Sequence, residues 1–132
     1  MEVRNKLYEI GHFDVEGQIA ELIDNGILNE ERYAKAFAGG KFRMLQWGRE
    51  KIKQQLKLKK ISDYCIKKAM TEINADDYDA LLLKLATRKA AEVKSDRSLP
   101  SRKAKIYRYL LQKGFERDLI RDIITVVTAK NS

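Results

Sequence analysis

The sequence of 132 residues contains few of the residues that break helices, cross-link a chain or bind metals: one proline, one cysteine and one histidine. A single cysteine, Cys65, excludes an internal disulfide framework and suits a reducing cytoplasm. Its position on the apolar side of an expected helix predicts a small core residue. His12 has no cysteine or second histidine at metal-binding spacing, so we expect no zinc site and place His12 in a loop.

Long apolar stretches and catalytic motifs are also absent. Apolar runs such as Ala80–Leu83 are far too short to cross a bilayer, and no apolar run follows the charges of Met1–Arg4 as it would in a secretory signal. We find no phosphate-binding glycine loop, nucleophile elbow or zinc-protease motif. Asp76 and Asp77 point about 100° apart on a helix, which indicates helix N-terminal residues and not a catalytic pair. We therefore expect a cytoplasmic protein that is not an enzyme, with no cofactor, metal or membrane partner.

Positive charge is concentrated in the middle of the chain. The net charge is +8, but residues 1–40 carry four basic and eight acidic side chains, residues 41–70 ten and two, and residues 71–132 thirteen and nine. A solvated helix face without a partner normally mixes both signs, whereas the middle segment is almost entirely basic. We expect a polyanion or an acidic protein groove as the partner, with plain solubility as the alternative.

A short apolar pattern occurs three times, at Val3–Leu7–Gly11, Ile52–Leu56–Lys60 and Ile106–Leu110–Gly114. The copies start 49 and 54 residues apart, and each is followed by a second apolar pair with a spacing of four. Self-similarity at such a period predicts a helical repeat array. Repeat arrays usually provide extended binding surfaces and not catalytic pockets.

Caps, glycines and apolar periodicity predict about eight helices and no convincing strand. The helices are expected over Glu2–Ile10, Val15–Asn25, a longer segment capped by Asn29, Gly48–Lys60, a segment capped by Ser62, a segment from Asn74 to Val93, a segment from Ser98 to Gly114, and Arg117–Thr128. We expect Gly39-Gly40 to bend or break the third helix. The order long–medium–medium then gives repeats over residues 1–27, 28–73 and 74–132. The first repeat lacks its leading helix, so the array is expected to be shortened at its N-terminus.

Three segments of the chain, by their order and spacing, resemble the RecX family of bacterial regulators of the RecA recombinase. They are Leu22–Ala34, Gly48–Leu56 and Lys105–Phe115. The residues that carry the resemblance are Gly26, Leu28, Glu30, Arg32, Tyr33, Ala34, Gly48, Ile52, Leu56, Ile106, Leu110, Gly114 and Phe115. Glu30 stands where the family commonly has Asp. Lys60 stands where it often has Gly, so we expect the fourth helix to end without a left-handed residue.

The resemblance implies an all-α fold of three tandem three-helix repeats, bent into an elongated, curved molecule. It also implies binding to the RecA–DNA filament, along its helical groove, and restraint of filament growth, ATPase, strand exchange and coprotease activity. The protein would then act in recombination, DNA repair and the SOS response. No catalytic step is implied.

Basic residues on the expected helices are the candidate contacts with DNA phosphates or with acidic groups of RecA. They are Lys51, Lys53, Lys57, Lys67, Lys68, Arg102, Lys105 and Arg108. Leu58 lies off the apolar stripe and is expected to add an exposed apolar contact. We expect Arg32 to form an ion pair between repeats and Trp47 to lie in the core, with direct partner contact as the alternative for both.

Two other functions stay open. A three-helix unit with a basic helix is also what helix-turn-helix DNA-binding modules use, and a helical adaptor for another acidic protein would have a similar composition. A DNA-binding module should bind bare DNA with an affinity that falls steeply with salt. A filament regulator should act at substoichiometric levels on RecA–DNA, and an adaptor should be captured with its partner in the absence of RecA.

Overall fold

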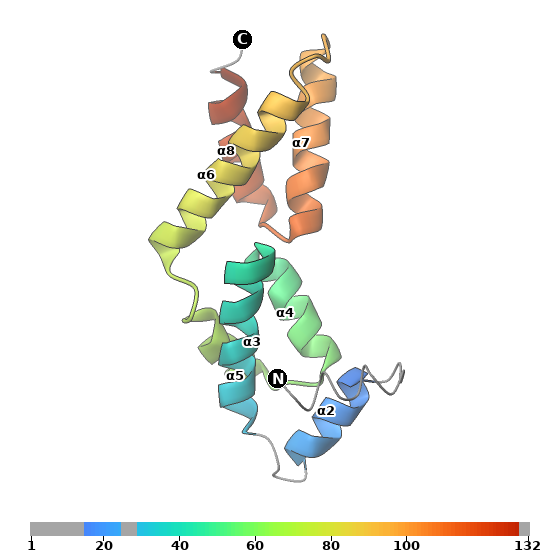
Figure 1. The fold of residues 1–132 in the computed structure, drawn as a ribbon, viewed down its shortest axis with the longest axis vertical. Helices are drawn as coiled ribbons and strands as arrows, with labels where there is room; N and C mark the ends of the chain where they lie inside the picture. Colours follow the sequence, from blue (N-terminus) through green and yellow to red (C-terminus); the bar gives the residue numbers. More distant parts are fainter. Residues whose placement is uncertain (1–14, 25–28, 130–132) are drawn as a thin grey trace. The chain divides into compact units, whose positions relative to one another are not determined.

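The computed structural model describes residues 15–24 and 29–129, and within these ranges the chain contains seven helices and no strand (Figure 1). The helices are α2 (Val15–Asp24), α3 (Glu30–Leu45), α4 (Arg49–Leu58), α5 (Asp63–Met70), α6 (Ala75–Glu92), α7 (Leu99–Lys113) and α8 (Arg117–Ala129). The all-α fold of three-helix repeats is confirmed. The helix expected over Glu2–Ile10, together with His12, Gly26 and Leu28, lies outside the described residues.

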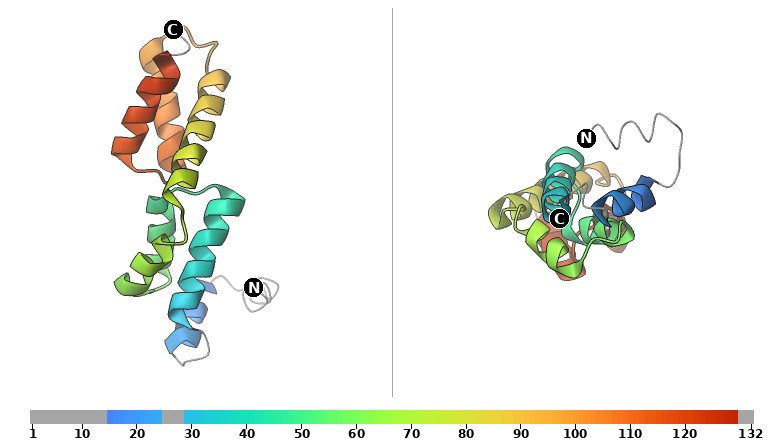
Figure 2. Two further views of the ribbon diagram at one scale, coloured as in Figure 1. Left: turned by 90° about the vertical axis from the view of Figure 1, so that its left-hand side faces the viewer. Right: turned by 90° about the horizontal axis from the view of Figure 1, so that it is seen from below.

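The described chain forms two compact units. The first holds the residues up to Gly39 together with Lys53–Glu72, and the second holds Gly40–Ile52 together with the residues from Ile73 onward. Helices α3 and α4 therefore contribute residues to both units. In the second unit α6, α7 and α8 pack against one another, as both side views show (Figures 1 and 2). The repeat boundaries at residues 27 and 73 stay a prediction.

The long helices α3 and α6 begin in the same way. The Asn29 side-chain oxygen accepts a hydrogen bond from the Arg32 N–H at 2.9 Å, and the Asn74 oxygen accepts one from the Asp77 N–H at 3.0 Å. Both asparagines are therefore the N-caps that the sequence predicted. A buried tyrosine lies four residues after each cap, Tyr33 in the first unit and Tyr78 in the second. This agreement supports α3 and α6 as the leading helices of two successive repeats.

Each unit has its own apolar core. In the second unit the core stripe of α6 faces those of α7 and α8. The buried core residues of this second unit are Phe42, Ile52, Tyr78, Leu82, Leu85, Ala86, Ala90, Ile106, Leu110, Phe115, Ile120, Ile124 and Val127. In the first unit they are Ile19, Ala20, Tyr33, Ala34, Phe37, Leu56, Ile61, Cys65, Ile66 and Ala69. Burial of each large aliphatic or aromatic side chain contributes about 1.5–3 kcal/mol, so tertiary packing stabilises helices that are too short to form alone.

Of the bend or break expected at Gly39-Gly40, the break does not occur, because α3 continues through both glycines to Leu45. Buried Phe37, Ala38 and Phe42 lie on either side of the pair. Their packing outweighs the cost of about 1 kcal/mol for each helical glycine. The residue that follows the helix, Gln46, has a φ of 58°, and its N–H donates to the Phe42 carbonyl at 3.1 Å.

The prediction that the fourth helix ends without a left-handed residue is also wrong. Lys60 itself has a φ of 62°, and Gly114 at the end of α7 has a φ of 99°. At each end the next residue closes the same loop: the Ile61 N–H donates to the Leu56 carbonyl at 3.1 Å, and the Phe115 N–H to the Leu110 carbonyl at 3.2 Å. This six-to-one bond is that of a Schellman motif. In its two described copies, the apolar pattern repeated in the sequence therefore corresponds to a repeated helix end.

Candidate functional site

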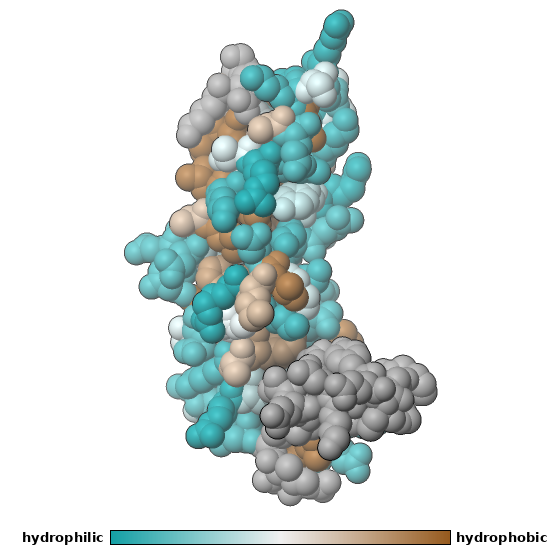
Figure 3. All heavy atoms as spheres, in the orientation of Figure 1, coloured by the Kyte–Doolittle hydropathy of each residue, from teal (hydrophilic) through white to brown (hydrophobic). Residues whose placement is uncertain are grey.

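Helix α7 is the most uniformly positive element in the described chain, with five basic residues and no acidic one. The apolar residues Ile106 and Leu110 face the core, which leaves the opposite side of the helix to solvent. Arg108 and Lys103 are exposed, and no ion pair joins either of them to another described residue. On the face drawn in Figure 3, hydrophilic residues cover most of the region of α7. The helix therefore presents a positive field to an anionic partner.

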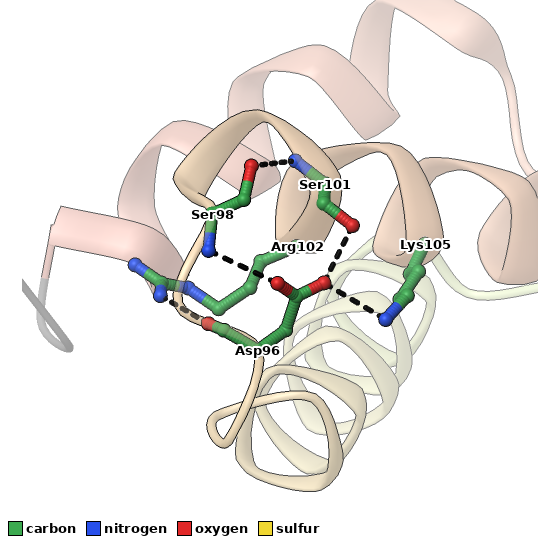
Figure 4. A network of polar contacts seen from close by, with 5 residues as sticks. All are labelled: Asp96, Ser98, Ser101, Arg102 and Lys105. Carbon is green, nitrogen blue, oxygen red and sulfur yellow. Dashed lines mark hydrogen bonds and ion pairs between the residues drawn. The ribbon is translucent and has the colours of Figure 1, made fainter.

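Two of the sequence-predicted residues on α7 have an internal role. Asp96, in the loop before the helix, accepts hydrogen bonds from the Ser98 N–H at 3.0 Å and the Ser101 hydroxyl at 2.5 Å (Figure 4). The Lys105 ammonium lies 2.8 Å from the Asp96 carboxylate, and the Arg102 guanidinium donates to the Asp96 carbonyl at 2.6 Å. Lys105, Ser101 and Ser98 hold the pKa of Asp96 well below its usual range. Arg102 and Lys105 thus anchor the start of α7 and are only partly available to a partner.

The candidates in the first unit lie on α4 and α5. Lys57, Lys67 and Lys68 are exposed, and Lys53 is half-buried. Leu58 is 66% exposed, which confirms its predicted position off the apolar stripe. Tyr64 is 63% exposed, and the Lys68 ammonium lies 5.5 Å from the centre of its ring. The first unit therefore presents lysines beside exposed apolar and aromatic side chains, a combination that suits protein or nucleic-acid partners.

Lys51 lies in the second unit, beside Trp47 in the connection between α3 and α4. Its ammonium is 4.8 Å from the centre of the indole ring, and that of Lys41 is 5.3 Å from it. Lys113, at the end of α7, donates from its ammonium to the Leu45 carbonyl at 2.8 Å. Partial burial and the nearby Lys51 charge lower the pKa of Lys113. Sequence reasoning missed Lys41 and Lys113, because nothing in the local pattern links them to Trp47.

The first turn of α4 rests on the last turn of α7. The Gly48 N–H donates to the Lys113 carbonyl at 2.7 Å, and the Glu50 N–H donates to the Gly114 carbonyl at 2.9 Å. Between them, the Arg49 N–H donates to the Tyr78 hydroxyl at 2.9 Å. These bonds satisfy groups that a helix end leaves unpaired, and they join the positive end of one helix dipole to the negative end of another.

Arg49, Tyr78 and Glu116 reinforce this junction. The Arg49 guanidinium lies 3.9 Å from the centre of the Tyr78 ring and 2.8 Å from the Glu116 carboxylate. The Tyr78 hydroxyl donates to the other oxygen of Glu116 at 2.5 Å. Burial and the Glu116 carboxylate raise the pKa of Tyr78 far above its usual value. The group is fully satisfied, so its geometry indicates a structural role.

The remaining motif residues occupy mostly structural positions. Tyr33, Ala34, Ile52, Leu56, Ile106, Leu110 and Phe115 are buried. Glu30 accepts a hydrogen bond from the Ser62 N–H at 2.9 Å, and the nearby Ser62 hydroxyl together with this bond lowers the pKa of Glu30. Arg32 is exposed, and Glu31 pairs with Lys35 at 3.1 Å. The ion pair expected of Arg32 is not found among the described residues. Cys65 is buried, as predicted, and burial raises the pKa of its thiol.

Two kinds of site are absent from the described part of the chain. Residues 15–24 and 29–129 contain no group of three or more His, Cys, Asp or Glu side chains that could hold a metal ion. No helix within these ranges is long and apolar enough to cross a membrane.

Comparison with known proteins identifies the repeats. Residues 29–70 match the family model for the second three-helix domain of RecX, and residues 76–124 match that for its third three-helix domain. The chain belongs to the RecX family. Together the two matches cover most of α3 to α8, and their order agrees with that of the two capped long helices.

Individual RecX proteins are similar over most of this chain. A regulatory protein RecX of Clostridium perfringens (strain 13 / Type A) is 31% identical over 130 residues, which are 96% of this chain and 60% of that protein. One from Escherichia coli O1:K1 / APEC is 36% identical over 113 residues, or 83% of this chain and 64% of that protein. The crystal structure of RecX from Lactobacillus salivarius matches with a TM-score of 0.69 at 28% identity, covering 97% of this chain and 84% of that one. The chain thus spans about 60% of the length of the curated relatives, and it is a member of a family of regulatory proteins.

Proposed function

We propose that this chain binds the RecA–DNA filament and limits filament activity. The observation that carries the proposal is the charge of helix α7. This helix is the second of the three in its RecX repeat, and it has five basic residues and no acidic one. Phosphates of the bound DNA and acidic groups along the filament are the partners that such a surface attracts. Binding along the filament would hinder its extension and lower its ATPase, strand-exchange and coprotease activities without any chemical step on this chain.

The filament ATPase provides the direct test. The protein is titrated into RecA on single-stranded DNA, and ATP hydrolysis is followed at each concentration. We expect a dose-dependent loss of hydrolysis with fewer molecules of this protein than of RecA. Unchanged hydrolysis at a stoichiometric excess would reject the proposal.

A variant in which four basic residues are neutralised tests the candidate residues of α4 and α7. Lys105 is a poor choice, because its loss would release Asp96 and disturb the start of α7. Lys103 is exposed on the same helix and replaces it in the variant K53Q/K57Q/K103Q/R108Q. A control with the same change in net charge, K84Q/R88Q/R117Q/R121Q, alters exposed basic residues of α6 and α8. We expect the first variant to stay folded and to inhibit the ATPase at least about tenfold more weakly, since each lost phosphate contact weakens binding. Equal inhibition by both variants would mean that only net charge matters.

Direct DNA binding by the helix-turn-helix-like repeats is the second candidate function, favoured by the same charge on α7. Its signature is tight binding to bare DNA with a steep salt dependence. If the chain binds bare duplex DNA as tightly as it inhibits the filament, the DNA-binding function takes precedence.

A further inference from the structure

The connection between α3 and α4 brings one aromatic ring and three cations together within the second unit. Trp47 is half-buried, the ammonium groups of Lys41 and Lys51 lie over its ring, and Lys113 reaches the neighbouring Leu45 carbonyl. Lys51 and Lys113 form no ion pair with another described residue. Between Lys41 and Ile52 the sequence has only one acidic residue, Glu50.

One pair in this arrangement, Lys51 and Lys113, is unfavourable for the isolated protein. Partial burial and, to a smaller extent, the Lys51 charge lower the pKa of Lys113, so both disfavour its charged form. Like charges in proximity oppose folding unless an anion neutralises them. Lys51 and Lys113, which no described acidic side chain pairs with, are therefore suited to an anionic partner.

We infer that Trp47 with Lys41, Lys51 and Lys113 is a contact site for single-stranded DNA, in which a base stacks on the indole and the lysines bind the flanking phosphates. Proteins bind single strands through this combination of an aromatic platform and cations along the backbone. An acidic peptide would engage the lysines, but its acidic side chains would not stack on the indole. A duplex would keep its bases stacked inside and unavailable to the ring.

The lysines that now cover the ring do not prevent stacking. Each cation over an exposed aromatic ring is worth roughly two- to fivefold in an equilibrium constant, so two are worth roughly four- to 25-fold, whereas a base stacked on an aromatic side chain is worth roughly five- to 150-fold in affinity. Lysine side chains are flexible, so an ammonium displaced by the base can move to a phosphate. The exchange therefore favours the bound strand when the displaced lysines bind its phosphates.

Fluorescence tests the site directly, because Trp47 is the only tryptophan in the chain. An oligothymidylate single strand is added at low ionic strength, without RecA, and the indole emission is followed. We expect saturable quenching by this probe and little change with a polyglutamate peptide of equal charge. Quenching by polyglutamate alone would make the site a surface for acidic protein, and no quenching by either probe would also overturn the inference.

Variants separate stacking from charge, with binding measured by the anisotropy of labelled oligothymidylate. W47A should weaken binding about fivefold or more, and W47F should retain most of the affinity because a phenyl ring still stacks. K51Q/K113Q should reduce the slope of log affinity against log salt by about 1.4, because each lost phosphate contact with a single strand lowers the slope by about 0.7. The control K84Q/R88Q changes net charge equally on exposed residues of α6 and should leave the slope unchanged. Equal slopes for the two double variants, or unchanged binding by W47A, would reject the site.

The inference rests on the proposed function in one respect: it takes the bound single strand to be the DNA of the RecA–DNA filament. If W47A binds the oligonucleotide normally while the wild-type chain inhibits the RecA ATPase, the site is wrong and the function stands. If the wild-type chain is quenched by the oligonucleotide but leaves the ATPase unchanged, the site stands and the function is wrong.

Discussion

Gly48 and Gly114 approach so closely that a Cβ atom placed on Gly48 would lie 2.3 Å from the carbonyl carbon of Gly114. The converse is equally tight, since a Cβ on Gly114 would lie 2.3 Å from the Cβ of Lys51. This approach lets the Gly48 and Glu50 N–H groups reach the carbonyls of Lys113 and Gly114. The two glycines therefore fix how the start of α4 rests on the end of α7, and with it the place of Trp47 and Lys51.

The variant G48A is expected to lower the free energy of unfolding by about 1–3 kcal/mol, because its new methyl group meets backbone atoms that cannot move aside. Urea denaturation followed by circular dichroism measures the change. G40A is the matched control: a Cβ at Gly40 meets nothing within 4 Å, so alanine within α3 should stabilise the protein by about 0.5–1 kcal/mol. Equal effects of the two substitutions would contradict the close approach.

The variant K60G should stabilise the end of α4. Lys60 adopts a left-handed conformation with a φ of 62°, which costs a residue with a side chain about 1 kcal/mol and costs glycine almost nothing. We expect a gain of about 0.5–1 kcal/mol in the free energy of unfolding, measured in urea. K60A keeps a Cβ and should give no such gain. A loss of stability in K60G would mean that the lysine side chain contributes more than the backbone conformation.

Local rules accounted for the helix starts and for most of the buried faces. The capping asparagines Asn29 and Asn74 and the capping Ser62 are local signals, since each acts on an N–H three residues ahead. The apolar pairs Ile52/Leu56 and Ile106/Leu110 are buried as their helical spacing predicted. Prediction failed where tertiary packing decided the outcome: it carries α3 through its glycines, and it holds Lys60 in a conformation that propensity assigns to glycine.

The candidate surface was harder to predict than the fold. A helical wheel places Lys105 opposite the core of α7, but it does not show that Asp96 in the preceding loop will bind it. Likewise, the three lysines near Trp47 come from α3, α4 and α7, which meet only in three dimensions. Charge composition gives the sign of a surface. It does not distinguish the cations that are already used inside the protein.

The variant Y78F should destabilise the second unit. It removes the hydroxyl that accepts the Arg49 N–H and donates to Glu116, and it leaves both partners without that bond. The expected loss is about 1–3 kcal/mol in the free energy of unfolding. Y64F removes the hydroxyl of a tyrosine that is 63% exposed and should change stability by less than about 0.5 kcal/mol. If urea denaturation gave the same value for both variants, the Arg49–Tyr78–Glu116 group would have no special role.

Asp96 should make stability depend on pH on the acid side. Lys105, Ser101 and the Ser98 N–H lower the pKa of Asp96 in the folded protein, so folding favours the ionised carboxylate. This contribution is fully present above the unfolded-state pKa of about 3.9 and is lost as the pH falls through the lower folded-state value. D96N removes it at every pH. The difference in free energy of unfolding between wild type and D96N should therefore be constant above about pH 5 and shrink below about pH 4, as urea denaturation at several pH values measures.

K105Q provides the complementary measurement, because Lys105 is the largest cause of the lowered pKa of Asp96. Its removal should bring the folded-state pKa of Asp96 closer to the ordinary value, so that K105Q and wild type differ at neutral pH and converge in acid. A difference that stayed the same from neutral pH to pH 3 would show that Lys105 stabilises the protein by means other than its ion pair with Asp96. Since α7 begins at this loop, the same measurement reports how firmly the start of the basic helix is held.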